Sequence, residues 1–156
     1  MRISLERLLR TGQMGDLTLG MSAEQVRALL GEPDAFGSIS RKYPRPCVWL
    51  YGSVELYFRQ KAPHDLRAVF WDAKEKGPLR LPAHCVVEDW ALSSAMARSD
   101  IESWLQSIHL AVVKAHSPPA SPTTVLVLSS GVNLTFDERE RLYSVYTSPA
   151  SQEKAE

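Results

Sequence analysis

Residues 47–72 alternate between apolar and polar types in a pattern that predicts a three-stranded meander. In the middle run, Val54, Leu56 and Phe58 alternate with polar or amphipathic residues. A period of two is typical of a strand with one buried face. An apolar, aromatic run and a Gly-Ser turn precede it, and a charged loop and a second β-rich run follow it. The predicted strands cover residues 47–51, 54–58 and 66–71.

The same order of patterns returns between residues 123 and 148. An apolar run, a Ser-Ser-Gly turn, an alternating run, a charged link and a third β-rich run follow one another. Val132, Leu134 and Phe136 occupy the apolar positions of the alternating run. The recurrence predicts an internal repeat, which decides the expected fold. The alternative is that two unrelated hairpins share the pattern because each has one buried face.

The clearest helix is predicted over residues 22–30. Ser22 stands at the N-cap position, and Gln25 is placed to complete a capping box. Gly31 and Pro33 follow the last apolar residue and end the helix. The apolar stripe of this helix consists of Val26, Leu29 and Leu30.

A second helix is predicted over residues 99–108, with Ser99 as its N-cap and Glu102 completing the Ser-x-x-Glu pattern. Its apolar face consists of Ile101, Trp104, Leu105 and Ile108. Three other segments have weaker patterns. They are a short amphipathic helix at residues 3–10, a polar loop at residues 34–45, and a strand at 85–87 that precedes a possible helical turn at 88–90.

These elements predict an α+β protein in which a tandem α-β-β-β repeat forms one antiparallel sheet of about six strands, with the helices on one face. Antiparallel pairing follows from the short links between strands. We expect a single domain, 1–156, made of one helix-plus-meander unit at 13–72 and a second at 83–148. Residues 149–156 are expected to be a disordered tail.

The charge balance and the cysteine count exclude some partners and compartments. Lysine plus arginine and aspartate plus glutamate number 18 each, which argues against a nucleic-acid partner that requires many phosphate contacts. No run of 18 apolar residues is present, so no membrane segment is expected. The charged N-terminal stretch is unlike a signal peptide, and Cys47 and Cys85 form no CxxC motif. We therefore expect a cytoplasmic protein with two free thiols.

No catalytic or metal-binding motif stands out. His64, His84, His109 and His116 have no metal-like spacing, and the neighbouring His84 and Cys85 would point to opposite faces of a strand. The sequence lacks a P-loop, HExxH and G-x-S-x-G. We therefore expect no enzyme, no cofactor and no metal. A small enzyme that brings the histidines and cysteines together with carboxylates is the rival class.

The outer face of the predicted sheet is the candidate binding surface. If the apolar residues of the alternating runs face the helices, aromatic and polar side chains face outward. Aromatic rings with a polar atom are suited to a protein interface. The predicted protein-binding residues are Trp49, Tyr51, Glu55, Tyr57, Phe70, Asn133, Thr135 and Tyr146. The alternatives are that the face has no partner, or that a second copy covers it in a homodimer.

Leu19-Gly20-Met21-Ser22, the following helix and its Leu30-Gly31-x-Pro33 end resemble a recurrent bacterial pattern. Similar openings occur in the small lipoprotein of the outer-membrane β-barrel assembly machinery and in proteins that look like immunity proteins of polymorphic toxin systems. The tandem helix-plus-meander is similar to the β-lactamase inhibitor protein fold, which binds its enzyme through one sheet face. The resemblance implies a non-catalytic protein that neutralises a cognate toxin. An assembly or scaffold module is the alternative, disfavoured because no lipid-bearing N-terminal cysteine is present.

Overall fold

The computed structural model describes residues 1–38, 41 and 45–149. The helices within this part of the chain are α1 (Leu5–Thr11), α2 (Ala23–Leu30) and α3 (Arg98–Ser107). The strands are β1 (Arg2–Ile3), β2 (Ala35–Gly37), β3 (Val48–Tyr51), β4 (Val54–Phe58), β5 (Leu66–Asp72), β6 (Val86–Val87), β7 (Val112–His116), β8 (Thr124–Leu128), β9 (Val132–Phe136) and β10 (Leu142–Thr147). The expected disordered tail, 149–156, lies outside the described residues apart from Pro149.

One antiparallel sheet contains eight of these strands, in the order β2-β3-β4-β5-β10-β9-β8-β7. The remaining two, β1 and β6, pair in parallel. The strands β5 and β10 meet at the centre, where Tyr146 lies opposite Phe70. The predicted α+β class and the antiparallel sheet are confirmed, whereas the expected number of about six strands is too low.

The two additional strands, β2 and β7, lie at the edges of the sheet. β2 falls within residues 34–45, which were expected to be a loop, and residues 39–40 and 42–44 of that loop lie outside the described part. All residues of β2 and of β7 are exposed. A strand without a buried face has no reason to alternate apolar and polar residues, so the pattern that marks the inner strands is missing here.

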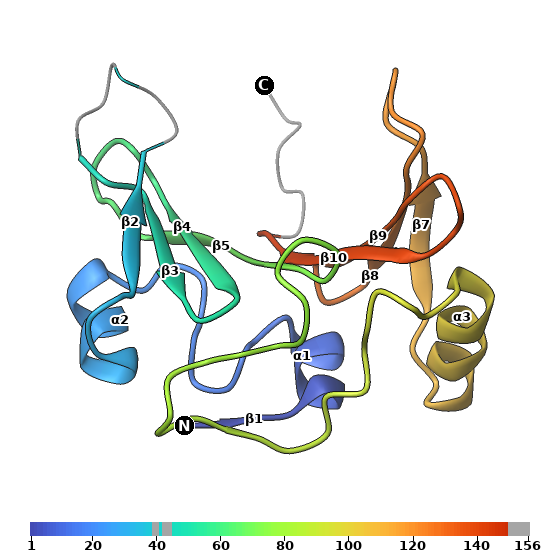
Figure 1. Ribbon diagram of the computed structural model, residues 1–156, viewed down its shortest axis with the longest axis horizontal. Coiled ribbons are helices and arrows are strands. Elements are labelled where there is room, and N and C mark those ends of the chain that lie inside the picture. The colour runs from blue at the N-terminus through green and yellow to red at the C-terminus, as the bar shows by residue number, and fades with distance from the viewer. Residues whose placement is uncertain (39–40, 42–44, 150–156) are drawn as a thin grey trace.

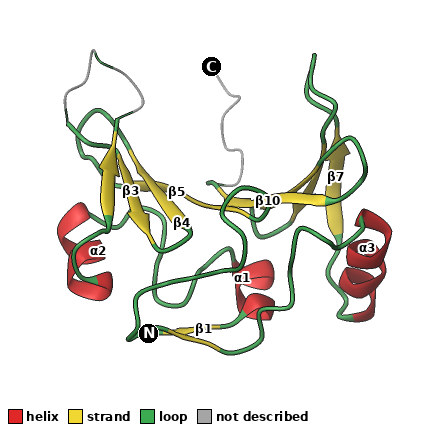
Figure 2. Cartoon of the chain, viewed as in Figure 1, coloured by secondary structure: helices red, strands yellow, loops and turns green. Residues whose placement is uncertain are grey.

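Figure 2 shows that α1, α2 and α3 all lie on the same side of the sheet. The apolar positions of β4 and β9 face them, and Leu56, Leu134 and Phe136 are completely buried, as predicted. Val26 and Leu30 of α2 and Ile101 and Leu105 of α3 are also in this core. The predicted core residues Leu29 and Trp104 are only half-buried, since they lie at the margins of the two apolar stripes.

Helix α2 begins as its sequence predicts. The Ser22 hydroxyl accepts a hydrogen bond from the Gln25 backbone N–H at 3.2 Å, and the Gln25 side chain accepts one from the Ser22 N–H at 2.9 Å. The capping box thus satisfies two N–H groups that the helix itself leaves free. At the other end, the Gly31 N–H donates to the Arg27 carbonyl at 2.8 Å.

Helix α3 begins earlier than predicted. Its N-cap is Ala97, not Ser99, and no side chain caps it. The backbone of residue 97 is held by a contact with the second meander: Ala97 forms a β-bridge with Arg141, and the Arg98 N–H donates to the Glu140 carbonyl at 2.8 Å. The tertiary contact therefore decides where this helix starts, and Ser99 lies within its first turn.

Helix α1 lies beneath the middle of the sheet, between α2 and α3 (Figure 1). Residues 88–90 form no helical turn; instead, the Asp89 carboxylate supports the start of α1, whose N-cap is Ser4. The carboxylate accepts hydrogen bonds from the Leu5 N–H at 2.6 Å and from the Ser4 hydroxyl at 2.9 Å. Burial by itself would raise the pKa of Asp89, but these hydrogen bonds outweigh it and lower the pKa below its usual value.

Candidate protein-binding face

The side of the large sheet opposite the helices is the candidate binding face, and we call it the open face. Figure 1 shows β2–β4 and β7–β9 rising on either side of β5 and β10 on this side. Strand alternation and register place alternate residues of the inner strands there. Its central residues are Val48, Leu50, Glu55, Tyr57, Ala68, Phe70, Asp72, Asn133, Thr135, Ser144 and Tyr146.

Trp49 and Tyr51 do not lie on the open face, and the prediction that they do is wrong. Trp49 is 5% exposed and Tyr51 is fully buried. The reason is the register of the hairpin, in which the two-residue Gly-Ser turn places Tyr51 opposite Val54 and Trp49 opposite Leu56. Directly opposed residues share a face, so both aromatic rings belong to the core.

The buried Tyr51 joins the first meander to α2. Its hydroxyl donates a hydrogen bond to the Gly31 carbonyl, just beyond the end of the helix, at 2.9 Å. Burial, reinforced by the nearby Glu32 carboxylate, raises the pKa of Tyr51 to about 12. The hydroxyl therefore stays protonated and keeps this bond over the physiological pH range.

Three predicted aromatic residues do come together on the open face. Tyr57 and Phe70 pack edge to face, with ring centroids 6.3 Å apart and planes at 90°. Tyr146 lies directly opposite Phe70 on the neighbouring central strand. All three rings are half-buried, so each keeps surface that a partner can cover. Edge-to-face pairs of this kind also hold the rings in a defined orientation.

The predicted residue Glu55 orients Tyr57. The Tyr57 hydroxyl donates to Glu55 Oε2 at 2.6 Å, and Lys76 Nζ lies 3.6 Å from Glu55 Oε1. Burial, followed by the hydrogen bond to Glu55, raises the pKa of Tyr57 well above its usual value. Glu55 thus has both a hydrogen-bond donor and a cation beside it.

A groove of about 680 Å³ opens beside these rings, and we call it the aromatic groove. It is lined by Tyr57, Phe58, Arg59, Gln60, Lys61, Arg67, Ala68, Phe70 and Tyr146. Prediction identified three of these residues as binding residues and missed the cations. Arg59 and Lys61 belong to the link between β4 and β5, which no sequence pattern positions.

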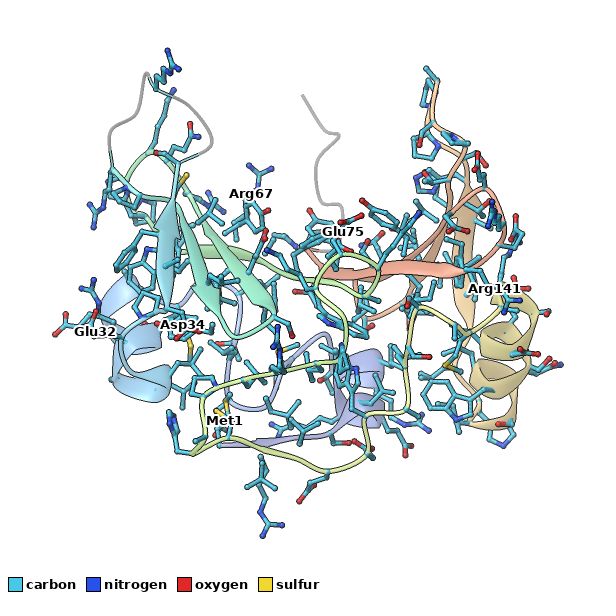
Figure 3. The ribbon with its side chains drawn as sticks, viewed as in Figure 1. Met1, Glu32, Asp34, Arg67, Glu75 and Arg141 are labelled. Atoms are coloured by element: carbon cyan, nitrogen blue, oxygen red, sulfur yellow. The ribbon has the colours of Figure 1, made fainter. Side chains whose placement is uncertain are left out.

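The position of Arg67 depends on a β-bulge. Tyr57 pairs with Ala68 and Phe58 pairs with Leu66, so Arg67 is the extra residue between two paired positions. A bulge turns a side chain away from the regular alternation. Figure 3 shows Arg67 above β5, on the side away from the helices. Strict alternation assigns residue 67 to the opposite face, so the sequence pattern alone could not find it.

Asn133 and Thr135 lie on the open face, as predicted, but outside the aromatic groove. Asn133 is opposite Tyr146, and Thr135 is opposite Ser144. The Asn133 side-chain amide donates to the Gly131 carbonyl at 3.0 Å. The predicted binding residues that do lie on the open face therefore form two groups. Glu55, Tyr57, Phe70 and Tyr146 lie on the first meander and β10, and Asn133 and Thr135 lie on β9.

Two of the residues considered for catalysis, Cys47 and His64, border the same small recess, whereas His84 lies elsewhere, against α2. His84 Nε2 contacts the Leu29 carbonyl at 3.1 Å, and neither Cys47 nor Cys85 forms a disulfide. Cys47 and His64 border one recess of about 10 Å³, which has room for about one water molecule. Among the described residues, no three His, Cys, Asp or Glu side chains are grouped closely enough to hold a metal ion.

The fold and the open face define the class of this molecule as an α+β protein with a large antiparallel sheet that its helices cover on one side. Comparisons of the chain with models of protein families, with curated proteins and with solved structures found no match. Within the described part of the chain, no helix combines the length and the apolar character that crossing a membrane requires.

Proposed function

We propose that this chain is a non-catalytic protein-binding module that uses the open face of its sheet, and that it acts as a cytoplasmic immunity protein against a cognate toxin. The aromatic groove is the observation that carries the proposal. Tyrosine and arginine are the residue types in which binding energy concentrates at protein interfaces, and Tyr57, Tyr146 and Arg67 line this groove together.

The shape of the site also supports a protein partner. The groove is formed by strands of a hydrogen-bonded sheet, so its rings sit on a rigid support. Half-buried rings lose little conformational freedom when they are covered, which favours binding. The toxin, as the particular partner, rests on the resemblance of the segment from Leu19 to Pro33 to immunity-type proteins.

The tandem repeat, which we propose together with this function, has support in matched contacts of the two halves. The Leu66 N–H donates to the Met21 carbonyl at 2.7 Å, and the Leu142 N–H donates to the Met96 carbonyl at 3.0 Å. In both halves the methionine directly precedes the N-cap of the helix. The cap is Ser22 in one half and Ala97 in the other.

Matched irregularities also support the repeat. Both β5 and β10 have a β-bulge at their second residue, where each strand pairs with the strand that precedes it in the sequence. In β5 the bulged residue is Arg67, and in β10 it is Tyr143. Two unrelated hairpins would have no reason to share a bulge, a helix contact and a strand order at corresponding places.

Co-purification with the product of the neighbouring gene tests the function. The wild-type chain should retain this partner, and Tyr57→Ala combined with Phe70→Ala should weaken the complex by at least about tenfold because the groove loses its rings. Tyr143→Ala is the matched control, since it removes a ring from the corresponding bulge outside the groove. Circular dichroism should confirm that all three proteins are folded.

Two results would contradict the proposal. One is a complex that survives in the folded Tyr57/Phe70 variant, which would place the interface elsewhere. The other is turnover of a small molecule by the purified chain that depends on Cys47 or His64, which would favour the enzyme class. Export of the chain from the cytoplasm would separately contradict the proposed compartment.

A further inference from the structure

The aromatic groove has an apolar floor and a cationic rim. Ala68, Phe70 and Tyr146 contribute apolar surface, whereas Arg59, Lys61 and Arg67 carry positive charge. None of the described residues that line the groove is a carboxylate. This local imbalance contrasts with the equal numbers of acidic and basic residues in the whole chain.

The three cations differ in how far the protein itself neutralises them. Arg59 Nε lies 3.0 Å from Asp65 Oδ1, in an ion pair. Lys61 and Arg67 are exposed, and neither forms an ion pair with a carboxylate in the part of the chain that the structure describes. The charges of Lys61 and Arg67 can therefore pair with acidic groups of a partner.

The Glu55 carboxylate on the open face does not cancel these charges. Glu55 accepts the hydrogen bond from Tyr57 and lies 3.6 Å from the Lys76 ammonium. Its charge is therefore matched by a lysine outside the groove. A partner that approaches the rim meets a net positive potential, and complementary charge raises both the rate and the specificity of association.

We propose that the groove binds an acidic peptide segment of the partner, in which aspartate or glutamate flanks an aromatic or aliphatic side chain. The inference rests on the proposed protein-binding function and names the chemistry of what is bound. The apolar side chain packs against Phe70 and Tyr146, and a carboxylate pairs with Arg67. The guanidinium is suited to this role because it holds both carboxylate oxygens at once.

A protein segment fits the groove better than a nucleic acid does. Single-stranded nucleic acids bind by stacking bases on open ring faces along a continuous basic track. Here the Tyr57 and Phe70 rings pack at 90° against each other, and two unpaired cations neutralise few phosphates. A partner that combines a few carboxylates with an apolar side chain satisfies both parts of the groove.

A random peptide library displayed on phage, selected on the full chain, tests the inference directly. Selected peptides should be enriched in aspartate and glutamate next to Phe, Trp, Tyr or Leu. Fluorescence polarisation should show that Lys61→Glu with Arg67→Glu weakens these peptides by at least about tenfold, since two attractive charges become repulsive. Lys114→Glu with Arg139→Glu, the same charge change in the other half, should alter Kd by less than about twofold.

Further variants show whether weaker binding results from the lost charges or from misfolding. Lys61→Gln with Arg67→Gln removes the charges without repulsion and should also weaken binding. Arg67→Lys keeps the charge but loses the two-point contact, so its affinity should lie between those of the unaltered chain and of Lys61→Gln with Arg67→Gln. On the unaltered chain, raising the salt concentration should weaken the peptides, because exposed ion pairs are screened.

Several outcomes would overturn the inference. They are the absence of any enriched peptide, enrichment without acidic residues, and affinity that Lys61→Glu with Arg67→Glu leaves unchanged. Binding of a labelled oligothymidylate at the groove would assign it to nucleic acid instead. A dimer in sedimentation that dissociates in the Lys61/Arg67 variant would assign it to a second copy.

Binding of the cognate partner to the Tyr57/Phe70 and Lys61/Arg67 variants separates failure of this inference from failure of the proposed function. If the complex needs Tyr57 and Phe70 but not Lys61 and Arg67, the open face binds the partner and the acidic segment is wrong. If the complex needs neither pair, the proposed function itself fails.

Discussion

The two halves of the sheet use the same order of elements but carry different side chains on the open face. In each half a helix is followed by four strands, α2 by β2–β5 and α3 by β7–β10. The inward positions correspond, as Leu56 and Leu134 do. Outward, β4 has Glu55 and Tyr57, whereas the matching strand β9 has Asn133 and Thr135.

This difference indicates where the sequence is free to change. Inward side chains must fill one continuous core between sheet and helices, so their size and apolar character are constrained on both sides. Outward side chains meet solvent or a partner. The bulged residue shows this contrast, because it is Arg67 in β5 and Tyr143 in β10.

The largest expected effect tests whether the two halves of the core are equivalent. Leu56→Ala and Leu134→Ala should each lower the free energy of unfolding by about 2–5 kcal/mol, because each leaves a cavity under the sheet. Tyr57→Ala should cost less, because the ring is half-buried on the open face. Urea denaturation of the three variants measures this, and a Tyr57 loss equal to that of Leu56 would contradict the assigned faces.

The helix caps provide the next comparison. Ser22→Ala should cost about 1 kcal/mol, because the Gln25 N–H loses its acceptor. Ala97→Ser should stabilise by about 0.5 kcal/mol, since Ala97 already has the extended cap conformation, with φ −78° and ψ 150°. Thermal melts of both variants measure the difference. A loss of stability in Ala97→Ser would show that this cap position has no room for a hydroxyl.

Tyr51 supplies a bond that the second half lacks, because Leu128 occupies the end of the corresponding strand. Tyr51→Phe should lower the free energy of unfolding by about 0.5–1.5 kcal/mol through loss of the hydrogen bond to the Gly31 carbonyl. Tyr143→Phe is the matched control and should be neutral in the same urea melts. Equal losses in the two variants would rule out a specific contribution from Tyr51.

The smallest effect concerns the loop between β9 and β10. Hydrogen bonds from the backbone, first that of Arg141, lower the pKa of Asp137 below its usual value. Asp137 therefore stabilises the fold at neutral pH, and this stabilisation is lost as the pH falls through its folded pKa. Asp137→Asn should cost less than about 1 kcal/mol at pH 7 and should reduce the loss of stability on acidification.

Urea melts between pH 7 and pH 3 measure how steeply the free energy of unfolding falls on acidification. The loop of the first half is closed by the Arg59–Asp65 pair, whose side chains are 54% and 18% exposed. Arg59→Ala is therefore a useful comparison and should change stability by no more than about 1 kcal/mol. An unchanged acid slope in Asp137→Asn would mean that other carboxylates carry the pH dependence.

Local sequence determined the elements whose signals are complete within a few residues. Ser22, Gln25 and Gly31 specify both ends of α2, because a capping box and a terminal glycine satisfy backbone groups from nearby in the chain. Alternation specified β4 and β9 and which of their side chains face the core. For the same reason, Tyr57, Phe70 and Tyr146 could be placed on the open face without a structure.

Tertiary structure decided the features that depend on which segments meet. The face on which Trp49 and Tyr51 lie follows from the register of a hairpin, and the start of α3 follows from a backbone bond to Glu140. Arg67 reaches the groove only because β5 contains a bulge. Register, bulges and long-range bonds are set by the pairing of distant backbone groups, whose geometry a local pattern of side chains does not encode.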